Sequence, residues 1–341
     1  MDDGIWTLLQ NDVRVLFQFI CVWWVMALIS GGLLMLKIYS RLTLGVCKYE
    51  IDLSGKTVII TGGNTGIGKE AAKDLARRHA SVVLACRNQE RAKMAAEDIV
   101  NSTGNKKIEA MELDLSSQKS VREFVEEFKR THDRLDILIN NAGVFALPER
   151  TLTVDGYEMT FATNHLGHFL LTNLLLEMLM KCAPSRIITV SSASYRLGII
   201  NFDNLNSERY YISDIAYSHT KLANILFTRK LANRLAGTGV TAYSLHPGLV
   251  CTNIFRHYHG VRKFLVDLIV TMYGKTAEEG AQTTIYLAVA PGVESLSGDY
   301  FADCKVMNTS PKTRDMDVAQ KLWDVSEHMT KLHPQTHTDT E

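Results

Sequence analysis

What the sequence lacks argues against several classes of protein. Its six cysteines lie far apart with no Cys-x-x-Cys pair, so they indicate unpaired thiols in a reducing compartment, and neither a disulfide framework nor a zinc site. Its 37 basic and 37 acidic side chains balance, so the composition shows no basic surface of the kind that binds nucleic acid. With six prolines, no repeats and no low-complexity segment in 341 residues, we expect no boundary between internal domains.

Charge is also missing from one long segment near the N-terminus. Residues 15–36 carry no charge and one strongly polar side chain, Gln18. At about 1.5 Å per residue, a helix of this length spans the roughly 30 Å hydrocarbon core of a bilayer. A cleaved signal peptide is the alternative, but its apolar core is normally shorter and its leader basic, whereas Asp2, Asp3 and Asp12 precede this run. The run therefore predicts a transmembrane anchor.

Basic residues flank the predicted anchor unequally. Lys37, Arg41 and Lys48 follow it, whereas Arg14 alone precedes it. By the positive-inside rule, the large C-terminal part should face the cytosol. The predicted organisation is a lumenal N-terminus (1–14), a transmembrane anchor (15–36), a linker (37–54), one globular domain (55–330) and a polar tail (331–341).

Short β-branched runs alternate with helical patterns from residue 55 onwards. Such alternation, at the spacing of βαβ units, predicts an α/β fold with a doubly wound Rossmann-type parallel sheet and helices on both faces. The expected strands are Lys56–Thr61, Ser81–Ala85, Lys107–Leu113, Leu135–Leu138, Arg186–Val190 and Val240–Leu245. The expected helices are Lys69–His79, Arg91–Val100, Val121–Lys129, Phe161–Leu179 and Tyr217–Leu235.

A glycine-rich turn follows the first expected strand. Its residues 61–68 read TGGNTGIG. Glycines let the backbone approach a pyrophosphate, and the helix N-terminus that follows offers free N–H groups and a positive dipole end. A simple tight turn is the alternative, yet this turn stands between a buried strand and a helix, where a dinucleotide binds. We therefore expect cofactor contacts from Gly62, Asn64, Thr65, Gly66, Ile67 and Gly68.

The end of the second expected strand carries no carboxylate. In an NAD-specific fold of this type, an acidic residue there binds the ribose hydroxyls. Here residues 85–88 read ACRN, and the guanidinium of Arg87 is placed to meet a 2′-phosphate, with Lys69 able to add charge. An ordinary surface arginine is the alternative. The missing acid and the arginine together predict NADP(H) as the cofactor.

Tyr217 has a lysine four residues later, at Lys221. On a helix the two side chains lie on one face. A free phenol titrates near pH ~10, and an ammonium held alongside lowers that pKa, which suits the phenol to proton transfer in carbonyl chemistry. Two solvated residues on an exposed helix face are the alternative, because about one such spacing is expected by chance among this many tyrosines and lysines.

The motifs TGGNTGIG (61–68), NNAG (140–143) and YSHTK (217–221) resemble those of the short-chain dehydrogenase/reductase family and appear in the family's order. The resemblance covers nearly everything after the linker. The stretches LACRN, NHLGHFLLT, VSS and AYSHTKLAN, together with the N-terminal anchor, look more closely like the microsomal retinol dehydrogenase branch of that family.

The resemblance gives roles to residues that would otherwise be interpreted as structural. Asp114 would hydrogen-bond the adenine, although it could equally cap a helix. Asn141 and Gly143 would line the cofactor, although Asn141 could otherwise brace the sheet. Asn164 would hold a water that relays protons to Lys221, although an asparagine inside a helix is more often a structural hydrogen bonder.

The resemblance also places residues around the reacting groups. Ser192, in preference to Ser191, would hydrogen-bond the substrate oxygen, although two serines at a strand end commonly form just a turn. Thr252, which follows His-Pro-Gly at 246–248, would contact the nicotinamide end of the cofactor. Residues 255–273 would form the substrate loop, either as an ordinary lid helix or as an apolar entrance that touches the bilayer.

The histidines and serines do not indicate other chemistries. His165 and His168 are three residues apart on a helix, but no third ligand stands at metal spacing, so we predict no metal. No Gly-x-Ser-x-Gly elbow surrounds any serine, which argues against hydrolysis.

The expected function is that of an NADP(H)-dependent oxidoreductase. It would interconvert a lipophilic alcohol and its carbonyl compound, retinol and retinal being favoured, with Tyr217, Lys221, Ser192 and Asn164 as the catalytic residues. A steroid or a lipid aldehyde is the alternative substrate, and a weakly active, membrane-tethered NADP-binding scaffold is the alternative function. The expected location is the endoplasmic reticulum membrane, with a lipid droplet as the alternative. The sequence leaves the oligomeric state open.

Overall fold

The computed structural model describes residues 41–332 and, before them, residues 23–26, 28, 30–32, 35 and 37–38. The chain divides into two units, residues 1–44 and residues 45–341. Among the described residues, no helix has both the length and the apolar character needed to cross a membrane. The anchor predicted at 15–36 lies largely outside them, as do the predicted lumenal segment and most of the predicted tail, so these remain predictions.

A single eight-stranded sheet organises the second unit, in the strand order β3-β2-β1-β4-β5-β6-β7-β8. All neighbouring pairs are parallel except β7 with β8. The strand order reverses at β1, so the carboxyl ends of β1 and β4 flank the switch point where doubly wound sheets bind ligands. The strands are β1 (Thr57–Thr61), β2 (Ser81–Cys86), β3 (Ile108–Glu112), β4 (Ile137–Asn140), β5 (Ser185–Val190), β6 (Val240–His246), β7 (Tyr300–Ala302) and β8 (Lys305–Val306).

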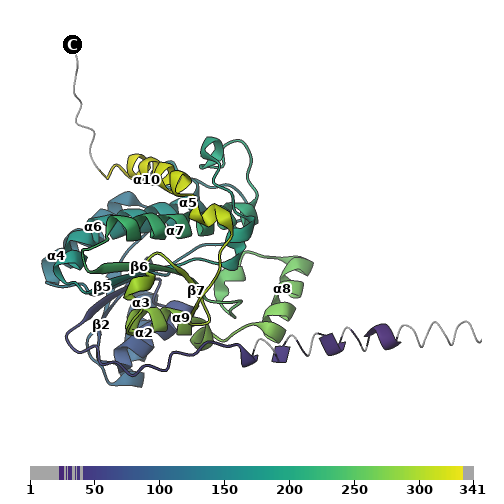
Figure 1. The fold of residues 1–341 in the computed structure, drawn as a ribbon, viewed down its shortest axis with the longest axis horizontal. Helices are drawn as coiled ribbons and strands as arrows, with labels where there is room; N and C mark the ends of the chain where they lie inside the picture. Colours follow the sequence, from purple (N-terminus) through teal and green to yellow (C-terminus); the bar gives the residue numbers. More distant parts are fainter. Residues whose placement is uncertain are drawn as a thin grey trace, which may run out of the picture. The chain divides into compact units, whose positions relative to one another are not determined.

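Helices cover both faces of the sheet (Figure 1). One layer contains α2 (Gly66–Arg77), α3 (Gln89–Thr103) and α9 (Ala277–Val289). The other contains α4 (Gln118–Thr131), α6 (Gly167–Lys181) and α7 (Ser213–Arg234), with α10 (Met316–Thr330) packed on α6 and α7. A short helix α5 (Met159–Phe161) and a π-helical turn, η1 (Ala162–Leu166), precede α6, and α8 (Gly260–Tyr273) lies beside the sheet.

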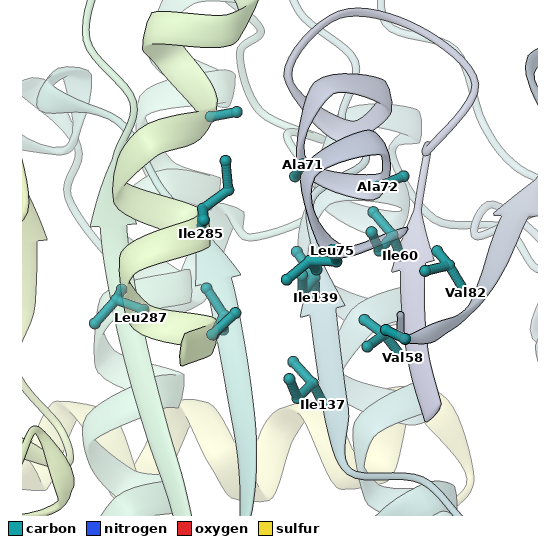
Figure 2. Close-up of a cluster of buried hydrophobic side chains, with 14 of the residues drawn as sticks. Val58, Ile60, Ala71, Ala72, Leu75, Val82, Ile137, Ile139, Ile285 and Leu287 are labelled. Carbon is teal, nitrogen blue, oxygen red and sulfur yellow. The ribbon is translucent and has the colours of Figure 1, made fainter. Parts of the chain in front are cut away.

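Successive side chains of β1 point to opposite faces of the sheet and join the apolar core on each face. Val58 and Ile60 point to the α2 and α9 side, where Figure 2 shows them beside Leu75 of α2. Ile59 belongs to the apolar cluster on the α4 and α6 side. All three side chains are fully buried, and each contributes roughly 1.5–3 kcal/mol by leaving water. A strand buried on both faces anchors the glycine-rich turn that follows it.

The predicted α/β fold and its Rossmann-type parallel sheet are confirmed, with differences at several boundaries. The fourth strand lies two residues later than predicted, and the expected helix over Phe161–Leu179 is interrupted by η1. The strands β7 and β8 and the helices α9 and α10 were not predicted from the sequence. The two strands have only three and two residues, too few to show an alternating pattern.

Candidate active site

The residues expected to be functional gather at the carboxyl edge of the sheet. The glycine-rich turn follows β1, Asn141 follows β4, and Ser192 follows β5. Tyr217 and Lys221 reach the same edge from the first half of α7, where both side chains are buried. Because parallel strands end at one edge, segments far apart in the sequence converge there.

The glycine-rich turn has the backbone geometry of a phosphate cradle. Gly62 and Gly66 have φ angles of +65° and +55°, which disfavour any residue with a Cβ. A Cβ at Gly68 would lie 2.5 Å from the Asn141 amide nitrogen and 2.6 Å from the Gly62 oxygen. Asn64, Thr65 and Ile67, also expected at the cofactor, lie in this same turn.

The start of α2 is suited to an anion. Thr65 is the N-cap residue but its side chain makes no capping hydrogen bond, and the first turn contains no acidic residue. The N–H groups and the positive end of the helix dipole are therefore available to a phosphate. Together with the close-packed glycines, this fits a dinucleotide pyrophosphate.

Three arginines lie within electrostatic range near the end of β2. Arg87 is exposed directly after the strand, and Arg91 lies in the first turn of α3. Burial lowers the pKa of Arg256, and the charges of Arg87 and Arg91 lower it further, so Arg256 lies within electrostatic range of both. Lys69, expected to add charge, instead forms an ion pair with Asp98 at 2.8 Å.

Asp114 shapes the turn between β3 and α4. Its carboxylate accepts hydrogen bonds from the Ser116 N–H at 2.9 Å and the Ser116 hydroxyl at 2.6 Å. The capping residue of α4 is Ser117, which accepts from the Ser120 N–H at 3.3 Å. The alternative interpretation of Asp114 as the helix cap is therefore wrong, and the adenine contact remains a prediction.

Asn141 braces the sheet, as its structural interpretation suggested. Its side-chain amide donates to the Thr61 main-chain oxygen at 2.9 Å, and its own N–H donates to the Thr61 hydroxyl at 2.9 Å. This hydroxyl accepts from the Ala142 N–H as well, at 2.9 Å. The end of β1, which begins the glycine-rich turn, is thereby fixed to the segment that follows β4.

A buried histidine extends this network to η1. The ring Nδ1 of His168 lies 3.2 Å from the main-chain oxygen of Asn164, and its Nε2 lies 2.9 Å from the Thr61 hydroxyl. A carbonyl oxygen accepts only, so Nδ1–H donates and the hydroxyl donates to Nε2. Burial lowers the pKa of His168 to about 3, so the ring is neutral. His165 likewise contacts Asn224 and Ser326, so both rings are engaged in packing hydrogen bonds.

Asn164 joins the loop after β4 to α7. Its oxygen accepts from the Val144 N–H at 2.8 Å, and its amide donates to the Val144 oxygen at 2.9 Å and the Thr220 hydroxyl at 3.2 Å. A Cβ at Gly143 would lie 3.3 Å from the Asn164 side-chain oxygen and 3.8 Å from Lys221 Nζ. These contacts show a structural role, and the water relay remains a prediction.

Tyr217 and Lys221 lie on one face of α7, but Lys221 does not bring the pKa of Tyr217 below its ordinary value, as the sequence had predicted. The Lys221 ammonium donates to the Val190 oxygen at 2.9 Å and lies 5.3 Å from the centre of the Tyr217 ring. Burial lowers the pKa of Lys221 to about 8. Burial also raises the pKa of Tyr217 above its ordinary value, while the nearby Ser192 hydroxyl acts in the opposite direction. The predicted lowering of the Tyr217 pKa is therefore wrong for this structure, because the cost of burying a phenolate dominates.

The two adjacent serines have different surroundings. Ser191 is buried, and its hydroxyl donates to the main-chain oxygen of Lys221 at 2.7 Å. Ser192 accepts from the Ser194 N–H at 3.2 Å, and its side chain lies close enough to Tyr217 to influence the pKa of that phenol. Ser192 therefore both shapes a turn and faces Tyr217, whereas Ser191 positions the helix.

The loop after β6 reaches the glycine-rich turn. The ring of His246 accepts from the Ala193 N–H at 3.2 Å, which ties β6 to the segment after Ser192. A Cβ at Gly66 would lie 3.2 Å from the Thr252 methyl group. Thr252 thus lies at the edge of the phosphate cradle, while its predicted cofactor contact stays a prediction.

An aromatic cluster that the sequence did not reveal stands over Tyr217. The ring of Phe145 contacts the Tyr217 ring edge-on, with centroids 4.4 Å apart. Phe255 and Tyr258 contact Phe145 in turn, with centroids at 5.7 and 5.5 Å. We call Phe145, Phe255 and Tyr258 the aromatic cluster. It places aromatic rings from two separate loops around Tyr217.

An ion pair fixes one side of this cluster. The Tyr258 hydroxyl donates to the carboxylate of Asp214, at the start of α7. Arg262 donates to both oxygens of the same carboxylate at 2.8 Å, and its guanidinium lies 4.0 Å from the Tyr258 ring centre. The loop after β6 is thereby attached to the helix that carries Tyr217.

Comparison with known proteins finds relatives that are similar over most of the chain. The family model for short chain dehydrogenase matches residues 56–260. Retinol dehydrogenase 11 from Mus musculus is 49% identical over 290 residues, covering 85% of this chain and 91% of that protein.

Two solved structures have a similar fold. A putative uncharacterized protein from Mycobacterium paratuberculosis superposes with a TM-score of 0.66 at 36% identity, covering 82% of this chain and 95% of the other. The Pseudomonas aeruginosa RhlG/NADP active-site complex superposes with a TM-score of 0.59 at 26% identity, covering 73% of this chain and 95% of the other.

Proposed function

The chain belongs to the short-chain dehydrogenase family, in its retinol dehydrogenase-like branch, and we propose that it interconverts retinol and retinal with NADP(H). The observation that carries the proposal is the convergence of Tyr217, Ser192 and Lys221 between a phosphate cradle and an aromatic cluster. A proton donor, a cofactor site and an apolar lining are what reduction of a lipophilic carbonyl compound requires.

Tyr217 acts as the proton donor to the carbonyl oxygen. When bound in the cradle, NADPH would supply the hydride for the carbonyl carbon. Burial keeps the Tyr217 phenol protonated, so its proton is available for donation. Ser192, whose side chain lies near Tyr217, orients the same oxygen, because a hydroxyl can donate to one group and accept from another.

Lys221 supports Tyr217 from within the protein. Its ammonium lies on the face of the Tyr217 ring and is held by the Val190 oxygen, so a positive charge stays near the phenolate that forms on proton transfer. A pKa of about 8 leaves Lys221 largely charged at neutral pH. Asn164 keeps the adjoining loop and α7 in register through Val144 and Thr220.

The preference for NADP(H) rests on charge at the end of β2. Arg256 lies within electrostatic range of Arg87 and Arg91 there, and a concentration of positive charge attracts an anion. A 2′-phosphate is such an anion, and guanidinium groups bind phosphate through paired N–H donors. The similar fold of a protein crystallised as an NADP complex gives further support.

The preference for a retinoid rests on the aromatic cluster and on the relatives. Phe145, Phe255 and Tyr258 offer ring faces and edges to a flat, conjugated chain. The relative that is 49% identical carries the name of a retinol dehydrogenase. We also propose that residues 15–36 anchor the protein in the endoplasmic reticulum membrane, where such a substrate dissolves.

Initial rates of the full-length protein test the proposed function. All-trans-retinal, a steroid ketone and a medium-chain aldehyde are each assayed with NADPH and with NADH. We expect the highest kcat/KM for retinal with NADPH, about tenfold or more above the value with NADH, since one charge-assisted phosphate contact contributes roughly 1.5–3 kcal/mol. Binding of NADPH without turnover of any of the three compounds would instead indicate a scaffold.

A further inference from the structure

Helix α8 turns its apolar side away from the protein. Its exposed apolar residues recur at intervals of three and four, so they lie on one side of the helix. Val270, the only buried residue in this fully described helix, lies on the opposite side. The exposed residues, which we call the apolar stripe, are Val261 (76% exposed), Phe264 (66%), Leu265 (50%), Leu268 (46%), Ile269 (51%) and Met272 (40%).

This orientation is the reverse of the usual one. A surface helix normally turns its apolar side to the core and its polar side to water. A large apolar side chain gains roughly 1.5–3 kcal/mol on full burial, which the apolar stripe largely forgoes. Figure 1 shows α8 beside the sheet, outside both helix layers. A contiguous exposed apolar surface marks an interaction site.

The charges around the apolar stripe favour a lipid partner. Residues 255–275 contain four basic side chains and one acidic side chain, and one of the basic ones, Lys275, is 16% exposed and ion-paired with Asp303 at 2.6 Å. Arg262 and Lys263 form ion pairs with Asp214 and Asp267, yet their side chains remain 57% and 43% exposed. Basic groups beside an apolar stripe fit a bilayer surface with anionic headgroups.

We propose that α8 docks on a bilayer that contains anionic lipid, with the apolar stripe at the boundary between headgroups and acyl chains. Phe255 and Tyr258, which directly precede α8, contact Phe145, and Phe145 contacts Tyr217. The docked helix therefore brings the aromatic cluster to the lipid surface. A lipophilic substrate then passes from the bilayer to Tyr217 without crossing water, a step that rests on the proposed function.

Photo-crosslinking tests the docking without any need for activity. The photoreactive residue p-benzoylphenylalanine is introduced at Phe264, which is 66% exposed on the apolar stripe. The matched control carries it at Tyr210, an aromatic residue that is 52% exposed on another surface. Each full-length protein is placed, one copy per disc, in nanodiscs of phosphatidylcholine and phosphatidylserine and then irradiated. Mass spectrometry identifies the adducts.

We expect lipid adducts at position 264 in several-fold excess over position 210. Equal adduct formation at the two positions, or none at 264, overturns the proposal. The same irradiation in vesicles that carry many copies of the protein tests whether a second copy covers α8 instead. Cross-linked dimers through position 264, in place of lipid adducts, would show that it does and would overturn the proposal. Failure of the proposed catalytic function leaves all of these outcomes unaffected.

A kinetic comparison tests the delivery step. The double variant Leu265→Gln, Ile269→Gln makes the apolar stripe polar, and Leu152→Gln, Val154→Gln is the control at exposed residues elsewhere. With retinal supplied in vesicles, we expect the KM of the stripe variant to rise about tenfold, as loss of roughly 1.4 kcal/mol of apolar contact predicts. Its activity towards a short, water-soluble aldehyde should match wild type. An unchanged KM for vesicle-borne retinal would overturn the delivery step.

Discussion

The ammonium of Lys221 donates a hydrogen bond to the main-chain oxygen of Val190, 2.9 Å away at the end of β5. This bond holds a cation beneath the ring of Tyr217, whose centre lies 5.3 Å from the nitrogen. The helix α7 and the strand β5 thus cooperate to place the charge. The Ser191 hydroxyl strengthens this link by donating to the main-chain oxygen of Lys221.

Replacement of Lys221 by methionine should greatly reduce turnover. Lys221→Met preserves the length of the side chain but removes the charge that stabilises a Tyr217 phenolate. We expect kcat for retinal to fall by about 10²–10⁴-fold, the usual contribution of acid–base assistance. Steady-state kinetics measure the effect, and Lys129→Met, at an exposed lysine of α4, is the control. A Lys221→Met enzyme with wild-type kcat would exclude a role for this charge.

Replacing each of the two neighbouring serines should affect different quantities, kcat for Ser192 and the free energy of unfolding for Ser191. Ser192→Ala removes the hydroxyl near Tyr217, so kcat should fall by about 10²-fold or more. Ser191→Ala removes the buried bond to the Lys221 oxygen, so it should cost about 1 kcal/mol of unfolding free energy. Kinetics and chemical unfolding on both variants distinguish the two roles. Equal loss of kcat in both would contradict the assignment of Ser192.

The arginines at the end of β2 should determine the choice of cofactor. Arg87→Ala should raise the KM for NADPH by about 10–100-fold, since a charged phosphate contact is worth roughly 1.5–3 kcal/mol. The KM for NADH, which lacks the phosphate, should change little. Arg256→Ala should also raise the KM for NADPH relative to the KM for NADH, because Arg256 lies in electrostatic range of Arg87. If both variants weaken NADPH and NADH equally, these residues do not recognise the 2′-phosphate.

Buried neutral histidines should destabilise the protein in acid. Burial lowers the pKa of His165 and of His246 to about 4 and that of His168 to about 3, whereas in the unfolded chain each titrates near pH ~6.5. The unfolded state therefore binds more protons below pH ~6.5, so the free energy of unfolding falls as the pH drops from there towards 4. Denaturant titrations at successive pH values measure this decline.

Single histidine variants test which side chains cause the loss of stability in acid. His165→Leu loses the contacts with Asn224 and Ser326, so it should be less stable at pH 7 but lose less further stability below pH ~6.5. His259→Gln, at an exposed histidine, should leave the acid dependence unchanged. Acid dependence that is identical in His165→Leu and wild type would show that other groups cause the loss.

Local patterns made much of the fold and site predictable. The buried β1 strand, the glycine-rich turn and the Tyr217–Lys221 spacing each lie within a few consecutive residues, so their geometry follows from short-range rules. The π-helical turn η1 was not predictable, because the side chain of Asn164 within it bonds Val144 and Thr220, 20 and 56 residues away in the sequence. Turns of this kind often occur at functional sites.

The aromatic cluster shows where sequence patterns fail. Phe145 follows β4 and Tyr258 follows β6, and no spacing rule relates two loops so far apart. Their contact depends on the sheet order and on the ion pair between Asp214 and Arg262. The direction of the Tyr217 pKa was also missed, because burial, which depends on the complete fold, outweighs the lysine four residues away.

Retinal reduction by Tyr217→Phe tests the central claim most directly. The substitution removes only the hydroxyl, so the ring contact with Phe145 and the helix α7 should be preserved. With saturating NADPH we predict a kcat about 10²–10⁴-fold below wild type, with NADPH affinity, measured by fluorescence titration, unchanged within about twofold. A Tyr217→Phe protein that reduces retinal at the wild-type rate would contradict the account.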